Sequence, residues 1–141
     1  MIEFTVYGLP QPKGSARAFV IPGNGGRKPR AVVTSDNPKA KPWAADIKRE
    51  AAAACGQKLF EREVPLRVMV SFAVTRPISA KPEKRPYPVV KPDVDKLART
   101  VLDALVGIVM VDDAQVVQLH VTKRYALGPT HATISITEFK E

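Results

Sequence analysis

The sequence predicts an α+β domain, a small mixed or antiparallel sheet with two helices packed on it. Four segments alternate apolar and polar residues, as half-buried strands do, at residues 2–8, 66–75, 117–122 and 132–137. Two other segments, 38–55 and 93–105, repeat apolar residues every three or four positions, as amphipathic helices do. The chain has 141 residues and no internal repeat, so we expect a single domain over residues 1–141.

The four strands are expected to hold different places in the sheet. Residues 2–8 show apolar groups on one side only, which predicts an outer wall of the core. Residues 66–75 carry apolar groups on both faces, which predicts a central strand. The last two strands are joined by the short link Ala126–Thr130, and we expect them to form a hairpin.

Both helices have recognisable ends. The first is expected to begin at Asn37-Pro38 and end at Gly56, with Trp43, Ile47, Ala51 and Ala54 on one face. The second follows Pro92-Asp93, and its apolar stripe comprises Val94, Leu97, Ala98, Val101, Leu102 and Leu105.

Two long segments are rich in proline or glycine. In the first, residues 16–21 are expected to pair with residues 31–34 as a hairpin around the sequence PGNGG. In the second, residues 76–92, five prolines forbid regular structure and hold the chain extended up to Asp93.

The net charge of +8 is concentrated in these two segments. Mobile Lys and Arg in loops suit phosphate contacts, although basic residues also keep small proteins soluble or contact anionic lipid. We favour a nucleic acid because the basic residues avoid the predicted helices and strands. The residues expected to contact DNA are Lys13, Arg17, Arg27, Lys28, Arg30, Lys81, Lys84, Arg85, Lys91 and Lys96.

Several classes of protein are disfavoured. No apolar run approaches the roughly 18 residues of a membrane span, and the N-terminus lacks a signal-peptide pattern, so we expect a cytoplasmic protein with no membrane partner. Cys55 is the only cysteine, which excludes an internal disulfide and a cysteine-bound structural zinc.

Two acidic pairs flank the second helix. Asp93 and Asp95 lie at its N-terminus, and Asp112-Asp113 follow it after an apolar link that can turn the chain back. Carboxylates brought close together repel unless a cation neutralises them, and Mg²⁺ does so while keeping waters that a phosphate can displace. Taken singly, each pair could instead be a helix cap or a turn. Both pairs around one helix, in so basic a chain, favour a metal site.

The stretch KPDVDKLARTVLDALVGIVMVDDAQVVQLHVTK resembles the core signature of the RusA-type Holliday junction resolvases. A D-x-D, a helix containing D-A-L, and a D-D-x-Q followed by Ile or Val occur there in this order. The segments GLPQPKGSAR and SDNPKAKPWAADIKREA resemble the phage branch of the same family.

The resemblance implies a RusA-like fold and a homodimer that binds a four-way DNA junction. With Mg²⁺ it would nick two strands symmetrically, in DNA recombination and repair, as a phage or prophage endodeoxyribonuclease does. The family's essential acids correspond to Asp93, Asp95 and Asp113, which are therefore the expected catalytic and metal-binding residues.

One departure from the family pattern affects the chemistry. Arg99 stands where the family has a lysine; an arginine can stabilise developing phosphate charge but cannot give up a proton. Asp103 could orient Arg99 from one turn further along the helix. Asp112 is expected to support the metal ligands from outside or to cap a turn.

Two alternatives remain open from the sequence. The chain could be a non-catalytic, structure-selective DNA-binding module whose acids only cap a helix. It could also be a nuclease that acts on other branched DNA, such as flaps or splayed duplexes.

Overall fold

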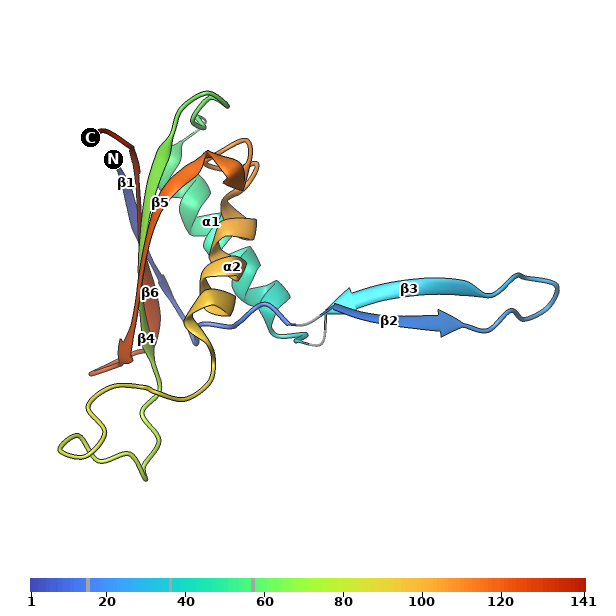
Figure 1. The fold of residues 1–141 in the computed structure, drawn as a ribbon, viewed down its shortest axis with the longest axis horizontal. Helices are drawn as coiled ribbons and strands as arrows, with labels where there is room; N and C mark the ends of the chain where they lie inside the picture. Colours follow the sequence, from blue (N-terminus) through green and yellow to red (C-terminus); the bar gives the residue numbers. More distant parts are fainter. Residues whose placement is uncertain (15, 36, 57) are drawn as a thin grey trace.

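A computed structural model describes residues 1–14, 16–35, 37–56 and 58–141 of the chain. It contains a four-stranded sheet, a separate two-stranded ribbon and two α-helices, which confirms the predicted α+β class (Figure 1). The four-stranded sheet comprises β1 (Ile2–Tyr7), β4 (Leu66–Val74), β5 (Val116–Tyr125) and β6 (His131–Glu138). The ribbon comprises β2 (Ala16–Ile21) and β3 (Arg30–Ser35), and the helices are α1 (Ala40–Cys55) and α2 (Val94–Leu105).

The sheet is mixed, with strand order β1-β6-β4-β5. Strand β4 is central, as predicted, and pairs antiparallel with β6 and parallel with β5. The expected hairpin between the last two strands is therefore wrong, because β4 lies between them. The link after Tyr125 instead crosses the end of β4, where the Ala126 amide donates to the Val74 carbonyl at 2.8 Å. It spans two inter-strand spacings, about 10 Å, which five residues easily reach.

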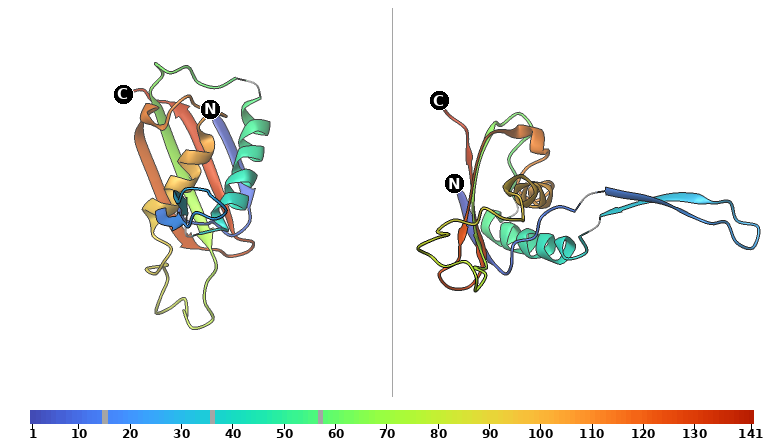
Figure 2. Two further views of the ribbon diagram at one scale, coloured as in Figure 1. Left: turned by 90° about the vertical axis from the view of Figure 1, so that its right-hand side faces the viewer. Right: turned by 60° about the horizontal axis from the view of Figure 1, so that its bottom comes forward.

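Both helices cover the same face of the sheet (Figure 2). The core between the layers contains Val68, Val70 and Phe72 of β4 together with Ile47 of α1 and Leu97 of α2. Large apolar side chains alternate along β4 so that every second residue enters this core, which is why its pattern was readable from the sequence.

One helix-face prediction is wrong. Trp43, Ile47 and Ala51 are buried as expected, but Ala54 is exposed. The buried stripe advances by four residues at each turn, so its next position is Cys55, which is half-buried, and not Ala54.

The β2–β3 ribbon projects from the body of the protein (Figure 1). Its strands pair antiparallel with Ile21 opposite Arg30, which confirms the predicted hairpin. Phe19 and Val33 of the ribbon are exposed, and neither belongs to the hydrophobic core. This strand pair thus forms outside the hydrophobic core of the protein.

The proline-rich segment between β4 and α2 has no helix or strand, as predicted, yet it is tied down. Arg76 donates from Nη1 to the carbonyls of Ala80, at 3.2 Å, and Arg85, at 2.8 Å. Its guanidinium also lies 4.2 Å from the centre of the Tyr125 ring. The segment therefore reaches the start of α2 along a defined path. In the part of the chain described, neither helix has the length and apolar character needed to cross a bilayer.

Candidate active site

Asp93 occupies the N-cap position of α2, but its side chain makes no capping hydrogen bond. It has extended backbone angles, φ −68° and ψ 141°, and its carbonyl accepts the Leu97 amide at 3.1 Å. An aspartate in this place ordinarily accepts a hydrogen bond from the first-turn amides, yet the Asp93 carboxylate makes no such bond. The carboxylate is exposed and remains open to another ligand.

The acidic turn after α2 is built on a short 3₁₀ helix, η1 (Asp113–Gln115). Asp112 caps it, because its Oδ1 accepts the Ala114 amide at 3.0 Å. Of the two roles open to Asp112, the structure shows the cap. Val109 and Met110 are fully buried just before this turn and anchor it to the core.

Gln115 fixes the acidic turn from within and was not singled out from the sequence. Its Oε1 accepts the amides of Val111, at 2.8 Å, and Asp112, at 3.1 Å. Its Nε2 donates to the carbonyls of Glu61, at 2.7 Å, and Val64, at 3.0 Å. The buried amide therefore satisfies two donors and two acceptors. The available signal was a polar side chain directly before an apolar strand.

A pocket of about 490 Å³ lies between α2 and β5 and collects most of the predicted acidic residues. Its apolar wall comes from both elements, and its lining is Val94, Asp95, Ala98, Arg99, Leu102, Asp103, Asp113, Leu119 and Val121. The structure thus brings Asp95 and Asp113 to one pocket, with Arg99 beside them. That these two carboxylates share a metal ion stays a prediction.

Asp93 opens on a neighbouring pocket and not on this one. Within the described ranges, no three Asp, Glu, His or Cys side chains lie close enough together to hold a metal ion. The expectation that Asp93, Asp95 and Asp113 converge on a single point is therefore not met in the isolated chain. Two of the three carboxylates share a pocket, and the third lies on an adjacent side of the helix.

The two carboxyl groups of the acidic turn are coupled. The protonated carboxyl of Asp113 donates a hydrogen bond to Asp112, and this bond, slight desolvation and the charges of Asp112 and Asp103 raise the pKa of Asp113, which nearby Arg99 partly offsets. The pKa of Asp112 is lowered, mainly by its hydrogen bonds to the Ala114 amide and to Asp113. Asp113 therefore holds a proton more tightly than a free aspartate does, and Asp112 holds one less tightly.

Asp103 has a different partner from the one expected. The structure pairs it with Lys13, whose Nζ lies 2.6 Å from Asp103 Oδ2, and not with Arg99. The cause is the loop after β1, which runs along α2 because the Lys13 amide donates to the Lys96 carbonyl at 3.0 Å. Lys13 thus lies beside the acidic pocket, and Arg99 is left facing Asp113.

Lys123 is a second residue that sequence reasoning missed. Its Nζ donates to the carbonyls of Val90, at 2.7 Å, and Pro92, at 2.8 Å. These bonds fasten the end of the proline-rich segment to β5 and so help to place Asp93. The sequence did contain a signal for it. Side chains two positions apart point to the same face of a strand, so Lys123 lies on the same helix-covered face as Leu119 and Val121.

The other predicted DNA-binding residues belong to three parts of the chain. Lys81, Lys84 and Arg85 are exposed in the proline-rich segment, and Lys91 and Lys96 are exposed next to Asp93. Arg27, Lys28 and Arg30 line a hollow at the tip of the β2–β3 ribbon. Arg17 lies in β2, and its side chain is outside the described part of the structure.

The protein is a small α+β domain in which aspartates and an arginine lie beside exposed basic loops. This arrangement is typical of the class of enzymes that act on nucleic-acid backbones. The sequence pattern of the family described as endodeoxyribonuclease RusA matches residues 11–137, nearly the whole chain. The chain is also 30% identical over 135 residues to "Uncharacterized protein YqaN" of Bacillus subtilis (strain 168), which covers 91% of this chain and 90% of that protein. The chain belongs to the RusA endodeoxyribonuclease family.

Proposed function

We propose that the protein is a magnesium-dependent endodeoxyribonuclease that nicks four-way DNA junctions symmetrically, as a homodimer, in recombination and repair. The observation that carries this proposal is that only one of the four clustered aspartates, Asp112, has its carboxylate engaged in a helix cap. The carboxylate of Asp112 caps the 3₁₀ helix, whereas that of Asp93, at the N-terminus of α2, makes no capping hydrogen bond. Asp95 and Asp113 line one pocket. Acids that only served folding would cap, as Asp112 does.

The residues at the pocket fit a magnesium ion. Mg²⁺ is held in proteins by one or two carboxylates, with waters and substrate phosphate oxygens completing its shell. Asp95 and Asp113, which line the same pocket, supply such a pair. We assign Asp93 as the third ligand. A bound ion would polarise the scissile phosphate and lower the pKa of an attacking water.

The chain's own side chains have separable tasks in this proposal. Arg99 stabilises negative charge that develops on the phosphate, and, unlike a lysine, it does not deliver a proton. Asp112 and Gln115 hold the turn that carries Asp113. Lys13 neutralises Asp103, so that this carboxylate adds less repulsion to the pocket.

A two-fold dimer suits a four-armed substrate, because an isologous pair presents two equal sites to two equal strands. Light scattering at micromolar concentration measures the mass directly; a monomer under all conditions would contradict the dimer.

The decisive experiment compares DNA substrates of the same sequence with Mg²⁺ and with EDTA. We expect paired nicks in a four-way junction only with Mg²⁺, and far slower cleavage of three-way and linear DNA. Equal cleavage of three-way DNA or flaps would support the wider branched-DNA nuclease instead. Junction binding without any nicking, by the wild-type chain in Mg²⁺, would favour the non-catalytic DNA-binding module.

The basic proline-rich segment is expected to contribute salt-dependent affinity. Replacing Lys84 and Arg85 together by alanine should weaken junction binding and reduce the slope of log affinity against log salt by up to about 1.8, the value for two lost phosphate contacts. Lys48→Ala with Arg49→Ala is the matched control, because this pair is also an adjacent, exposed Lys-Arg, but on α1. An equal change of slope in both double variants would refute the assignment of this segment.

A further inference from the structure

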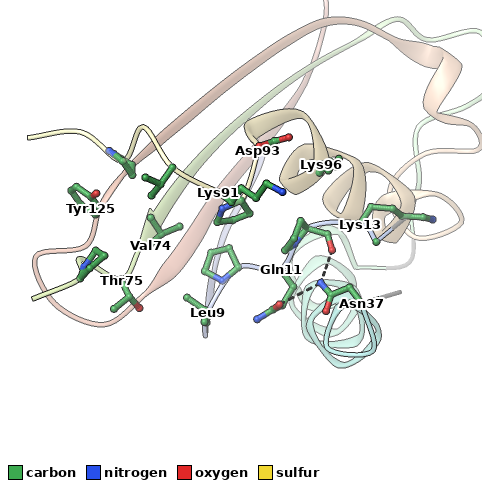
Figure 3. Close-up of a pocket in the computed structure, with 17 residues that line it drawn as sticks. Leu9, Gln11, Lys13, Asn37, Val74, Thr75, Lys91, Asp93, Lys96 and Tyr125 are labelled. Carbon is green, nitrogen blue, oxygen red and sulfur yellow. Dashed lines mark hydrogen bonds between the residues drawn. The ribbon is translucent and has the colours of Figure 1, made fainter. Parts of the chain in front are cut away.

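A second, larger pocket lies on the other side of Asp93 from the acidic pocket, and apart from Asp93 its lining residues have no task in the cleavage step proposed above. Its volume is about 630 Å³, within the roughly 300–1,000 Å³ typical of small-ligand sites. The loop after β1, the end of β4, the proline-rich segment and the first turn of α2 form most of it, and Asn37 before α1 and Tyr125 at the end of β5 complete it. Figure 3 shows Leu9, Val74 and Tyr125 on one side and Lys91, Asp93 and Lys96 on the other.

The walls of this pocket are held in place by hydrogen bonds between the segments. Asn37 donates from Nδ2 to the Pro12 carbonyl at 2.8 Å, and the Lys13 amide donates to the Lys96 carbonyl at 3.0 Å. Lys123 ties down Val90 from β5, with Nζ 2.7 Å from its carbonyl. The pocket is therefore formed before any ligand arrives.

One side of this pocket is apolar and the other is charged. Proline rings and aliphatic groups make one wall, where Val74 and Tyr125 are buried and the outer face of the tyrosine ring is covered by Arg76. Lys91 and Lys96 lie on the opposite side, with Asp93 as the only carboxylate among the lining residues. A ligand that fills this pocket has a flat or apolar part and an anionic part.

We propose that this pocket receives one unpaired nucleotide of the DNA at the branch point, with its base against the proline, valine and tyrosine wall and its phosphates near Lys91 and Lys96. This inference rests on the proposed nuclease function. A free phosphate would not use the apolar wall, an apolar ligand would not use the lysines, and an intact duplex is too wide to enter. The pocket adjoins Asp93, so a nucleotide held there is continuous with the strand that reaches the acidic groove.

Such a pocket gives the protein a physical means of selecting branched DNA. Extruding a base from a duplex costs unstacking and unpairing free energy, and the cost is least where the base is already unpaired. Nucleotides at a branch point are easily unpaired, whereas those in linear duplex are not. Occupation of the pocket therefore favours the branch without any reading of sequence.

Val90 and Val89 offer a matched pair of substitutions to test this. Val90 lines the pocket and is 49% exposed, whereas Val89 is 85% exposed and does not line it. Tryptophan at either position adds the same bulk to the same segment without changing charge. Thr75→Trp, at an exposed residue that also lines the pocket, is the second variant in case Val90→Trp unfolds.

The experiment uses four-way junctions with 2-aminopurine at each branch-point nucleotide in turn, in Ca²⁺ so that binding is measured without cleavage. We expect the wild type and Val89→Trp to change the fluorescence at one position. We expect Val90→Trp to abolish that change and to bind the junction about tenfold more weakly, with duplex affinity unaltered. Equal fluorescence changes and affinities in Val89→Trp and the pocket-filling variants would overturn the inference. A wild type that shows the change but never nicks in Mg²⁺ would refute only the nuclease proposal.

Discussion

Replacing Asp93 by asparagine is expected to abolish nicking while junction binding is retained. The substitution removes one negative charge and leaves the shape of the side chain, so only the proposed cation site and the charge balance of the reaction change. A loss of about 10²–10³-fold in rate is the size found when one charge-stabilising group is removed from an active site. Single-turnover cleavage with saturating enzyme measures the rate, and fluorescence anisotropy in Ca²⁺ measures the affinity.

Asp46→Asn is the control for this result. Asp46 also lies on a helix, on α1, where its Oδ1 pairs with Arg49 at 3.1 Å. The control should cut at the wild-type rate, because exposed pairs of this kind contribute little. Nicking by Asp93→Asn at the wild-type rate in Mg²⁺ would remove this carboxylate from the mechanism.

Gln115→Leu is expected to have the largest effect on stability of any substitution near the site. It leaves two backbone amides and two carbonyls without their buried partner, each worth about 1–3 kcal/mol if nothing replaces the bond. Because some of these groups gain water, we expect the free energy of unfolding to fall by about 3 kcal/mol. Urea denaturation followed by circular dichroism measures it.

Gln118→Leu provides the comparison. Gln118 lies on β5, half-buried, and accepts a hydrogen bond from Arg67 through its side chain. Its loss should change the free energy of unfolding by less than about 1 kcal/mol, since water can reach the vacated group. If Gln115→Leu proved as mild as this control, the acidic turn would owe its position to the buried Val109 and Met110 instead.

The sequence predicts which residues enter the core far better than it predicts which strands pair. Alternation in β4 and β6 correctly marks Val70 and Ile134 as inward-facing. Alternation carries no information about neighbours, however, and the short link after Tyr125 suggested a hairpin that the structure does not contain. The two strands are instead separated by β4, which pairs with β6 along one edge and with β5 along the other.

The candidate site was predictable where its residues are close in sequence. Asp95 and Asp113 reach one pocket because α2 and the turn after it are short. Asp93 does not join them, since it precedes the first turn of α2 with extended backbone angles and lines the neighbouring pocket. The partners supplied from distant segments, such as Lys13 to Asp103 across 90 residues, could not be predicted, because no local pattern specifies a contact of that range.

The projecting β2–β3 ribbon decides how variants of this protein can be interpreted. Because Phe19 and Val33 lie outside the core, we expect substitutions in the ribbon to leave the cooperative unfolding of the main sheet and its helices unchanged. Calorimetry of a ribbon variant measures this directly. If a substitution at Arg27 or Lys28 weakens DNA affinity while the unfolding of the main sheet is unchanged, the loss can be assigned to a missing contact with DNA.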